Sequence, residues 1–517
     1  MAVEDKNISY RIYLVAFAMF VMACAIVIKL TNIQWVEGAH YRKLAKERTV
    51  KNFKIEANKG NIYSADGSLL ATSIPNYEIR FDAVVPKTEL FQRSVDSLAD
   101  SLAYLLGKPS HFYENELRKA RAKKNRYFLI ARNLSYTDYV KIKGFPLFKA
   151  GANKGGIIVA QKTVREYPIG KIAERTIGYE RVKPDGTPDG KGIEWAYRKY
   201  LNGKDGKILK QKIAKGQWKP IRDLNEVDPI DGYDVISTID VFIQDIAHHA
   251  LLKQLEEYDA EHGCVVVMET KTGRIKAISN LGKATDGSYY ETQNYAITEA
   301  HDPGSTFKLV DLMAVLEDKV ADTSTVFDAN GGIIRIHGKP VEDSHHGLGK
   351  VSLAHGFEVS SNTIMVQSVY NNYKNNPSKF IKHIEDWGLD KKIGLELKGE
   401  ATPKIPKPGE AGWSALSLPW MAFGYGINVT PMQTLTYYNS VANNGVMVKP
   451  QLVSEIKKWN STIKKIEPQV INPKVCSPET LKKIRVVLEN VVRRGTAKSL
   501  YTKEFPMAGK TGTAQMN

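Results

Sequence analysis

An uncharged run near the N-terminus, IYLVAFAMFVMACAIVI from Ile12 to Ile28, is the feature that most constrains what this chain can fold into. Together with Leu30 and flanking residues, the run is near the lower limit of length for spanning a bilayer. A cleaved signal peptide is the alternative, because Ala23-Cys24-Ala25 resembles a small-residue cleavage site. The apolar run continues past that site, which favours an uncleaved transmembrane anchor at 12–30 after a short tail at 1–11.

The charges around the run do not decide which end lies on which side of the membrane. Lys6 and Arg11 are offset by Glu4 and Asp5, and several basic residues follow the run, so the positive-inside count does not favour a cytoplasmic tail. We nevertheless expect a cytoplasmic tail, because the rest of the chain has the character of an extracytoplasmic protein.

Length and charge narrow the classes of protein that fit. A chain of 517 residues should form two or more domains. The net charge of +17 would suit nucleic acid, a membrane surface, an anionic lipid-linked substrate or a cell-wall polymer. The anchor favours the membrane and wall partners, so nucleic acid is not an expected partner. The three cysteines, Cys24, Cys264 and Cys476, predict neither a disulfide framework nor a zinc site.

Two large regions follow the anchor. Residues 31–235 mix strand and helix patterns and carry no catalytic cluster. Within them the basic stretch from Lys204 to Arg222 is either a hairpin with one solvated face or a contact surface for an anionic glycan or lipid headgroup. From Tyr233 the pattern changes, and we assign 236–517 to a second domain.

The second domain should combine a sheet with several helices. Gly263–Met268 and Arg274–Ser279 have the pattern of two strands joined by a tight turn, and the first resembles a buried strand of a central sheet. Another strand is expected at 447–456. Apolar residues at helical spacing predict helices at 241–258, 309–318, 353–370, 377–388, 431–443 and 478–493.

Ser305 and Lys308 form the most distinctive chemical pair in the chain. Pro303 and Gly304 interrupt the chain just before them, and apolar residues recur at helical spacing from Leu309. Ser305 should therefore lie near a helix N-terminus, with Lys308 one turn further on the same face. A partly buried lysine can be neutral enough to take the serine proton, and a helix N-terminus favours a developing anion.

Ser-x-x-Lys alone is a weak signal, because the chain contains it twice more, at Ser454–Lys457 and Ser461–Lys464. Both copies fall in a polar, lysine-rich stretch that is typical of a solvated strand and turn. The Pro-Gly break and the apolar helix face distinguish Ser305 from these copies.

Two partner motifs lie downstream. Ser360-Ser361-Asn362 is the only Ser-x-Asn in the chain. Its hydroxyl could relay a proton and its amide could hold a peptide group, although a helix cap explains the motif taken alone. Lys-Thr-Gly occurs twice. Lys271–Gly273 fits the hairpin turn, whereas Lys510-Thr511-Gly512-Thr513 on a strand edge would offer a cation, hydroxyls and an approachable N–H to a carboxylate and an oxyanion.

Ser-x-x-Lys, Ser-x-Asn and Lys-Thr-Gly in this order resemble the motif set of penicillin-binding proteins and serine β-lactamases. Lys59–Gly67 is similar to the first motif of class B penicillin-binding proteins, without its usual Arg-Gly-x-Ile-x-Asp-Arg form. Arg165–Gly170 and Gly192–Glu194 are similar to the second and third blocks, and Ala422–Gln433 to the segment beside the family's active site. A plain β-lactamase lacks the region 31–235 that carries the first three of these blocks, so it is excluded. Ser-x-Asn resembles the division (FtsI) type, since the elongation type usually carries Asp at the third position.

The resemblance implies an α+β multidomain protein with an N-terminal transmembrane helix, an elongated mixed α/β pedestal or dimerisation domain and a serine β-lactamase-like transpeptidase domain. It implies a single-pass protein of the plasma membrane, with an extracytoplasmic bulk, that cross-links peptidoglycan stem peptides in septal wall synthesis and is a β-lactam target. A membrane-embedded glycan polymerase and other division proteins would be its partners. No metal or cofactor would be required.

The same resemblance gives roles to the reactive residues. Ser305 would attack the penultimate D-Ala carbonyl, and its backbone N–H would form half of the oxyanion hole. Lys308 would be the general base. Ser360 would relay protons, and Asn362 would hold the donor peptide.

The Lys-Thr-Gly segment would bind the donor. Lys510, Thr511 and Thr513 would hold its terminal carboxylate, and the N–H of Thr513, beside the small Gly512, would complete the oxyanion hole. The family's sheet normally continues after this motif, whereas the chain stops five residues after the glycine. We therefore expect a C-terminally incomplete domain whose activity as it stands is doubtful.

Two other functions stay open. A catalytically idle structural member of a wall-synthesis complex would fit an incomplete C-terminus. A β-lactam-sensing receptor would use the same fold, but it would need a cytoplasmic signalling region that the short tail does not supply.

Overall fold

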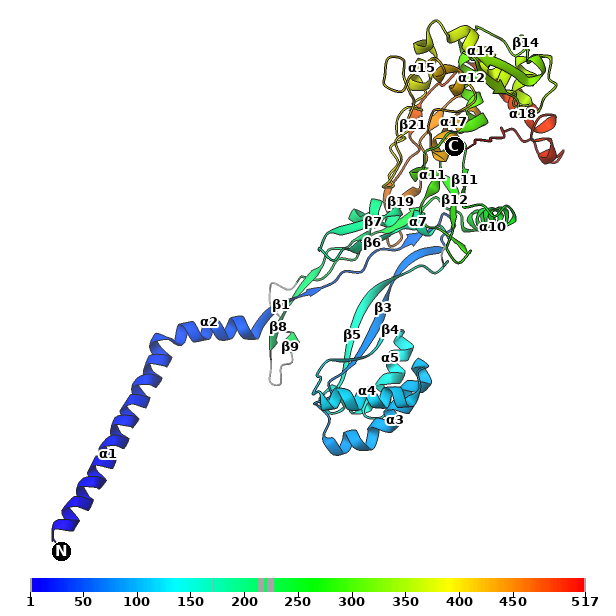
Figure 1. Cartoon of the computed structure of the whole chain (residues 1–517). Helices are drawn as coiled ribbons and strands as arrows, with labels where there is room; N and C mark the ends of the chain where they lie inside the picture. The colour runs from blue at the N-terminus through cyan, green and yellow to red at the C-terminus, as the bar shows by residue number, and fades with distance from the viewer. Residues whose placement is uncertain (1, 171, 213–217, 221–226, 516–517) are drawn as a thin grey trace. The chain divides into compact units, whose positions relative to one another are not determined.

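The computed structural model describes residues 2–170, 172–212, 218–220 and 227–515, and its chain divides into two compact units (Figure 1). The first unit comprises Met1–Asn58 and Gly203–Gly232, and the second comprises Lys59–Asn202 and Tyr233–Asn517. The predicted domain boundary at 235 therefore falls inside the second unit.

The first unit contains the apolar N-terminal helix. α1 (Ala2–Thr31) includes the whole uncharged run, and its side chains from Ser9 onward are exposed. Together with the π-helical turn Asn32–Val36 it gives one span, Ser9–Val36, that is long and apolar enough to cross a membrane. Exposed apolar side chains along a helix of this length are what a lipid environment would accept.

A small sheet completes the first unit. α2 (Gly38–Thr49) leads into β1 (Val50–Ile55), which pairs antiparallel with β8 (Gly206–Lys212), and β8 pairs with β9 (Trp218–Pro220). The β8–β9 pair agrees with the hairpin interpretation of the basic stretch. Residues 213–217 and 221–222 of that stretch lie outside the described residues.

A seven-stranded sheet runs through the second unit in the order β20-β19-β10-β2-β3-β4, with β5 paired to β3. β10 pairs with β2 on one side and with β19 on the other, so one sheet joins sequence before residue 235 to sequence after it. Its strands are β2 (Ile62–Tyr63), β3 (Leu69–Phe81), β4 (Phe128–Leu134), β5 (Ile157–Glu166), β10 (Asp234–Ser237), β19 (Val453–Lys458) and β20 (Ser461–Lys465).

The long strands β3 and β5 carry a small helical layer at one end (Figure 1). α3 (Thr88–Leu106) and α4 (Ser110–Ala122) pack there with α5 (Tyr136–Lys143) around a separate apolar core. Buried Val95, Leu98 and Leu102 recur at helical spacing on α3, which explains why this face turns inward.

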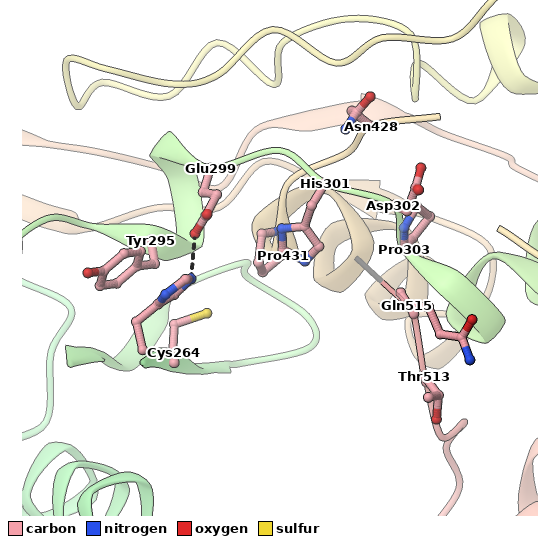
Figure 2. A pocket seen from close by; sticks show the side chains of 14 residues that line it. Cys264, Tyr295, Glu299, His301, Asp302, Pro303, Asn428, Pro431, Thr513 and Gln515 are labelled. Carbon is pink, nitrogen blue, oxygen red and sulfur yellow. Dashed lines mark ion pairs between the residues drawn. The ribbon is translucent and has the colours of Figure 1, made fainter. Parts of the chain in front are cut away.

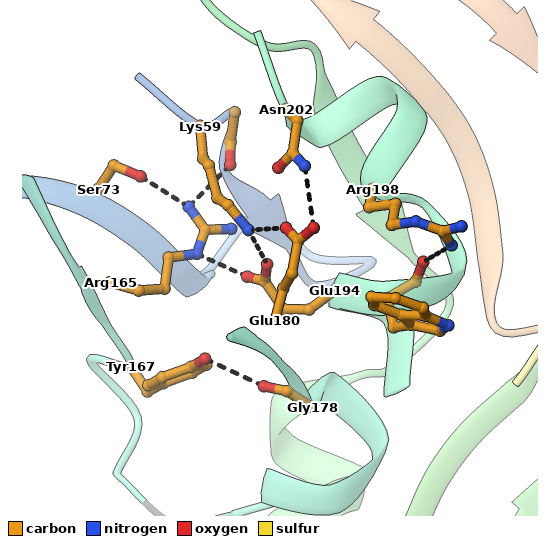
Figure 3. Close-up of polar contacts among 11 residues, drawn as sticks. Lys59, Ser73, Arg165, Tyr167, Gly178, Glu180, Glu194, Arg198 and Asn202 are labelled. Atoms are coloured by element: carbon orange, nitrogen blue, oxygen red, sulfur yellow. Dashed lines mark hydrogen bonds and ion pairs between the residues drawn. The ribbon is translucent and has the colours of Figure 1, made fainter. Parts of the chain in front are cut away.

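At the other end of β5 an ion cluster joins three distant sequence blocks (Figure 3). Arg165 donates from Nε to Glu194 Oε1 over 2.6 Å and from Nη1 to the Gly60 carbonyl over 2.8 Å. Lys59 forms ion pairs with Glu180 and, at 3.6 Å, with Glu194. A Cβ at Gly60 would lie 1.9 Å from a backbone carbonyl oxygen, so only glycine fits. The cluster therefore fixes the segment that enters the large sheet.

Short elements lie at both ends of the long strands: the first two named below are beside the helical layer, and the other five are near the ion cluster. They are η2 (Phe148–Ala150), α6 (Ala152–Gly155), α7 (Glu174–Ile177), β6 (Tyr179–Val182), β7 (Pro188–Lys191), α8 (Gly192–Ala196) and α9 (Arg198–Leu201).

A second sheet, in the order β11-β12-β13, lies close to the reactive motifs. It comprises β11 (His262–Met268), β12 (Ile275–Lys283) and β13 (Tyr289–Tyr290). The expectation of a buried first strand is wrong, because β11 is mostly half-buried and β12 is the buried one. Among the described residues β12 has a strand on each side and β11 on one, which accounts for the difference.

Most predicted helices of the second domain form close to their expected bounds. The exception is 353–370, which is broken into α13 (Leu353–Glu358) and α14 (Asn362–Tyr373). The predicted strand 447–456 is also two strands, β18 (Met447–Val448) and β19. The remaining helices are α10 (Val241–Glu257), α11 (Tyr295–Thr298), α12 (Lys308–Glu317), α15 (Pro377–Asp386), α16 (Ser417–Met421), α17 (Pro431–Ala442) and α18 (Pro478–Arg493).

α12 lies at the centre of the largest apolar core, with every residue from Lys308 to Leu316 buried. Around this core run the short strands β14 (Val326–Asp328), β15 (Ile333–Ile336), β16 (Lys339–Glu342), β17 (Lys350–Ser352) and β21 (Val470–Asn472). Lys308, at the first position of this helix, is therefore removed from water, which disfavours the charged form of its amine.

Candidate active site

Ser305 lies on a 3₁₀ helix, Gly304–Phe307, that continues directly into α12. In a 3₁₀ helix the side chains at i and i+3 eclipse, so Ser305 and Lys308 share a face, as predicted. Gly304 has a φ of +54°, and a Cβ there would lie 2.4 Å from the Thr513 carbonyl oxygen. The glycine therefore lets the C-terminal segment lie against the turn that carries the serine.

Lys308 is fully buried and makes three polar contacts through Nζ. It donates to the Ser360 carbonyl oxygen at 2.7 Å, to Asn362 Oδ1 at 2.6 Å and to Ser360 Oγ at 3.2 Å. The structure thus brings Ser-x-x-Lys and Ser-x-Asn together across more than 50 residues of sequence.

The electrostatics of this pocket favour a neutral amine. Burial, together with the nearby Lys510 charge, lowers the pKa of Lys308 to about 7, although Asp343 and Asp311 oppose the shift. A neutral amine keeps two N–H donors and gains a lone pair. It can hold the two shorter contacts, to Ser360 O and Asn362 Oδ1, and still accept a proton from a hydroxyl.

Ser360 occupies the break between α13 and α14 with a φ of +60°. A left-handed residue other than glycine costs roughly 1–2 kcal/mol, so the neighbouring contacts must hold it. Ser361 Oγ caps α14 by accepting from Ile364 N, and it donates to Asp343 Oδ2 over 2.7 Å. Thr363 N donates to Asp343 Oδ1 over 2.8 Å. This turn presents both the carbonyl and the hydroxyl of Ser360 to Lys308.

Lys510 approaches the same hydroxyl from the other side. Its Nζ donates to Ser360 Oγ over 2.8 Å and to the Thr511 carbonyl over 3.0 Å. Burial lowers the pKa of Lys510 to about 8. Ser360 Oγ therefore lies between two amines, accepts from Lys510 and has its own proton free to donate toward Lys308.

The expectation of a strand at Lys510–Thr513 is wrong for the described residues, because no strand forms between 501 and 515. This segment lies beside α18 and the serine turn instead of beside another strand, so its amides have no ladder to join. Gly509 N donates to the Leu488 carbonyl, and a Cβ on Gly512 would touch Thr306 Cγ2 at 2.8 Å. The contacts still place Thr511, Gly512 and Thr513 at the site.

A cleft of about 740 Å³ opens next to these residues (Figure 2). Pro303, Gly512 and Thr513 line one part of it. At the other part His262 pairs with Glu299 at 2.9 Å and stacks on Tyr295, with ring centroids 4.3 Å apart. Figure 2 shows the Glu299 carboxylate and the Tyr295 ring well separated from Thr513 within the same cleft. Neither Ser305 nor Lys308 lines the cleft.

The other copies of the motifs lie elsewhere. Ser454 and Lys457 are on β19, and Ser461 and Lys464 are on β20, an exposed strand. Lys271–Gly273 forms the turn between β11 and β12, where Gly273 has a φ of +73°.

Sequence reasoning missed three residues near the site. Asp343 holds the Ser360 turn, Asp311 is a fully buried carboxyl on α12, and Thr496 Oγ1 lies 2.6 Å from Thr511 Oγ1. A charged residue inside the apolar pattern of α12 was a signal for Asp311. No local pattern marked the other two.

The chain matches two family descriptions that together span most of its length. Residues 263–517 match "Penicillin binding protein transpeptidase domain", and residues 54–237 match "Penicillin-binding Protein dimerisation domain".

Curated proteins with similar sequences, and a solved structure with a similar fold, carry names or titles that refer to sporulation or to peptidoglycan synthesis. The chain is 27% identical to "Stage V sporulation protein D" of Bacillus subtilis (strain 168), in an alignment covering 100% of this chain and 78% of that protein. It is 25% identical to "Peptidoglycan D,D-transpeptidase FtsI" of Escherichia coli (strain K12), covering 95% and 79%. A structure titled "Structural coordination of polymerization and crosslinking by a peptidoglycan synthase complex" shares the fold, with a TM-score of 0.71 at 20% identity over 98% and 89% of the two chains. The chain therefore belongs to the class B penicillin-binding proteins, and within them to the division type.

Proposed function

We propose that this protein is a peptidoglycan D,D-transpeptidase that cross-links stem peptides through an acyl-enzyme on Ser305. One observation carries the proposal: the buried Lys308, with a pKa lowered to about 7, is hydrogen-bonded to both functional residues of Ser-x-Asn and shares a helix face with Ser305. A structural lysine would have been exposed or paired with a carboxylate, as are the lysines on the surface of α18.

In the acylation step Ser305 Oγ attacks the carbonyl of the penultimate D-Ala of a donor stem peptide. Lys308 takes the serine proton, and the tetrahedral oxyanion is held by the N–H groups of Ser305 and Thr513. The C–N bond breaks as the leaving D-Ala amine receives a proton from Lys308 through Ser360 Oγ. The hydrogen-bonded path from Lys510 through Ser360 to Lys308 supports this relay.

In the second step the amine of a neighbouring stem attacks the acyl-serine ester. Lys308, neutral again, takes the proton of the attacking amine, and the serine leaves with that proton as the new peptide bond forms. A β-lactam acylates Ser305 in the same way, but its leaving nitrogen stays tethered to the acyl group.

Donor binding falls to the residues around the serine. Asn362 spans the pocket, because its Oδ1 accepts from Lys308 and its Nδ2 donates to the Glu342 carbonyl over 2.7 Å. In our proposal it positions the donor peptide. Lys510, Thr511 and Thr513 take the terminal carboxylate, since together they supply a cation and two hydroxyl donors.

The setting is proposed from the anchor and the relatives. The protein would be held in the plasma membrane by α1, with its bulk outside the cytoplasm. There it would work in septal wall synthesis beside a membrane-embedded glycan polymerase and other division proteins.

Labelling with a fluorescent penicillin followed by peptide mass mapping tests the proposal. The adduct should map to Ser305 and disappear in Ser305→Ala. The matched control is Ser461→Ala, which removes the serine of a Ser-x-x-Lys copy on exposed β20 and should label normally. A folded protein that forms no adduct would instead support an idle structural role. An adduct without cross-linking of stem peptides would support the receptor role.

A further inference from the structure

We propose that Thr496 is a positioning residue for donor recognition, which acts by fixing the hydroxyl of Thr511 as a hydrogen-bond donor to the donor's terminal carboxylate. This inference rests on the proposed function, because it assumes that Thr511 meets that carboxylate. The side-chain oxygens of Thr496 and Thr511 lie 2.6 Å apart, and neither makes another hydrogen bond among the described residues.

The position of Thr496 is built by the same turn that holds Ser360. Glu358, the last residue of α13, is fully buried and accepts from Arg494 Nε and Nη2, each at 2.9 Å. Asn490 Nδ2 adds a third contact to the Glu358 carboxylate at 3.0 Å. A forked arginine contact to a buried carboxylate fixes orientation as well as distance. The end of α18 is therefore attached firmly to α13.

Backbone contacts then fix Thr496 itself. Its N–H donates to the Glu358 carbonyl over 3.1 Å. A Cβ on Gly495 would lie 2.2 Å from that oxygen, so only glycine permits the approach. Thr496 is thus bound to Glu358, which lies two residues before Ser360, although Thr496 itself comes more than a hundred residues later in the chain.

These contacts link the two motif segments in a closed path. Lys510 binds Ser360 Oγ, Thr511 follows Lys510, and Thr511 contacts Thr496, which is bound to Glu358. The two halves of the site, Ser-x-Asn and Lys-Thr-Gly, are therefore linked at two points.

The chemistry of the hydroxyl pair gives Thr496 its role. A hydroxyl has one proton, and a carboxylate only accepts. If Thr511 gives its proton to the donor's carboxylate, the contact between the two threonines must use the proton of Thr496. Thr496 therefore directs the Thr511 proton outward. Without it, the Thr511 hydroxyl can rotate and the carboxylate loses an aligned donor.

The expected effect is on binding and not on the bond-making step. Thr496→Val keeps the shape and the backbone N–H but removes the hydroxyl. It should raise the dissociation constant of a carboxylate-bearing penicillin about three- to tenfold, the usual range for one neutral hydrogen bond, and leave the saturating acylation rate unchanged. Thr496→Ser should restore wild-type binding.

A double-mutant cycle on the full chain tests whether Thr496 acts through Thr511. Stopped-flow acylation is measured for wild type, Thr496→Val, Thr511→Val and the double variant, with a fluorescent penicillin and with its methyl ester. We expect Thr496→Val to weaken binding of the acid in the wild-type background only, and to leave the ester unchanged.

The outcomes separate this inference from the proposed function. Equal effects of Thr496→Val in both backgrounds, equal effects on acid and ester, or no effect on either would overturn the role of Thr496 while Ser305 still labels. Absence of labelling in folded wild type would overturn the proposed function and this inference together.

Discussion

The pH dependence of Ser305 acylation tests the role of Lys308 in depth. Only the neutral amine can take the serine proton, and burial together with the Lys510 charge lowers the pKa of Lys308 to about 7. About 1% of Lys308 is then neutral at pH 5 and about 90% at pH 8. A lysine with the usual pKa of 10.5 would be only about 0.3% neutral at pH 8.

Stopped-flow acylation between pH 5 and pH 9 measures this directly. At saturating penicillin the rate should fall about 100-fold from its plateau to pH 5, with a midpoint near 7. The second-order rate constant should also decline above about 8, because Lys510, whose pKa is lowered to about 8, then loses the charge that holds the carboxylate. The pH profile of the saturating rate should therefore fall only on the acid side, whereas the profile of the second-order rate constant should fall on both the acid and the alkaline side.

Lys308→Arg is the matching substitution, because a guanidinium keeps the positive charge but does not deprotonate. It should lose about 10²- to 10⁴-fold in acylation together with the acid limb. Lys464→Arg changes the exposed copy of the motif and should alter nothing. A wild-type rate that keeps rising up to pH 9 would mean that Lys308 is protonated at neutral pH, and the reasoning would be refuted.

Three other substitutions test packing and buried charge. A Cβ at Gly424 would lie 1.9 Å from the Gly304 carbonyl oxygen, whereas at Gly409, with nearly the same φ, nothing lies within 4 Å. Thermal unfolding should therefore show Gly424→Ala about 1–3 kcal/mol less stable than Gly409→Ala. Equal losses of stability in the two variants would contradict this. Burial raises the pKa of Glu291 to about 7, so the stability that its protonated form contributes is complete below pH 4.5 and is lost as pH rises through 7. Over that window, denaturant unfolding should show the free energy of unfolding of wild type falling by about 3 kcal/mol relative to Glu291→Gln. A difference that stays constant with pH would exclude the shift. Asp311 is fully buried without a hydrogen bond among the described residues, so Asp311→Leu should raise the free energy of unfolding by about 1–3 kcal/mol, and a decrease would reveal a partner.

Local patterns were sufficient to predict the helix start at Ser305. The Pro-Gly break, the apolar spacing and the i to i+3 relation all lie between Pro303 and Glu317, and the structure agrees with each. Apolar spacing predicted one continuous helix over 353–370, whereas the helix-cap interpretation of Ser-x-Asn agrees with the break that the structure has there. This break is made by one left-handed residue, Ser360, and by the capping side chain of Ser361, and hydrophobic periodicity is blind to both.

Properties that depend on distant contacts could not be predicted from the sequence. The acceptors that hold Lys308 come from residues more than 50 positions away, and the second amine comes from Lys510. β11 was misjudged because an apolar strand at a sheet edge has the same composition as a central one. Thr496 is marked only by its contact with Thr511, which depends on how α18 is attached to α13.

The burial that makes Lys308 a base also lowers the stability of the folded protein. Lowering a lysine pKa from 10.5 to about 7 corresponds to about 5 kcal/mol of lost preference for the charged form. The apolar core around α12 and the contacts from Ser360 and Asn362 must offset this, because all three donors of a protonated amine would otherwise be unpaired. The reactive pair is therefore placed at the first turn of a buried helix, where the surrounding core supplies the stability. A more exposed α12 would fold more easily and would leave Lys308 protonated, so the position of this helix in the core is itself part of the proposed catalytic function.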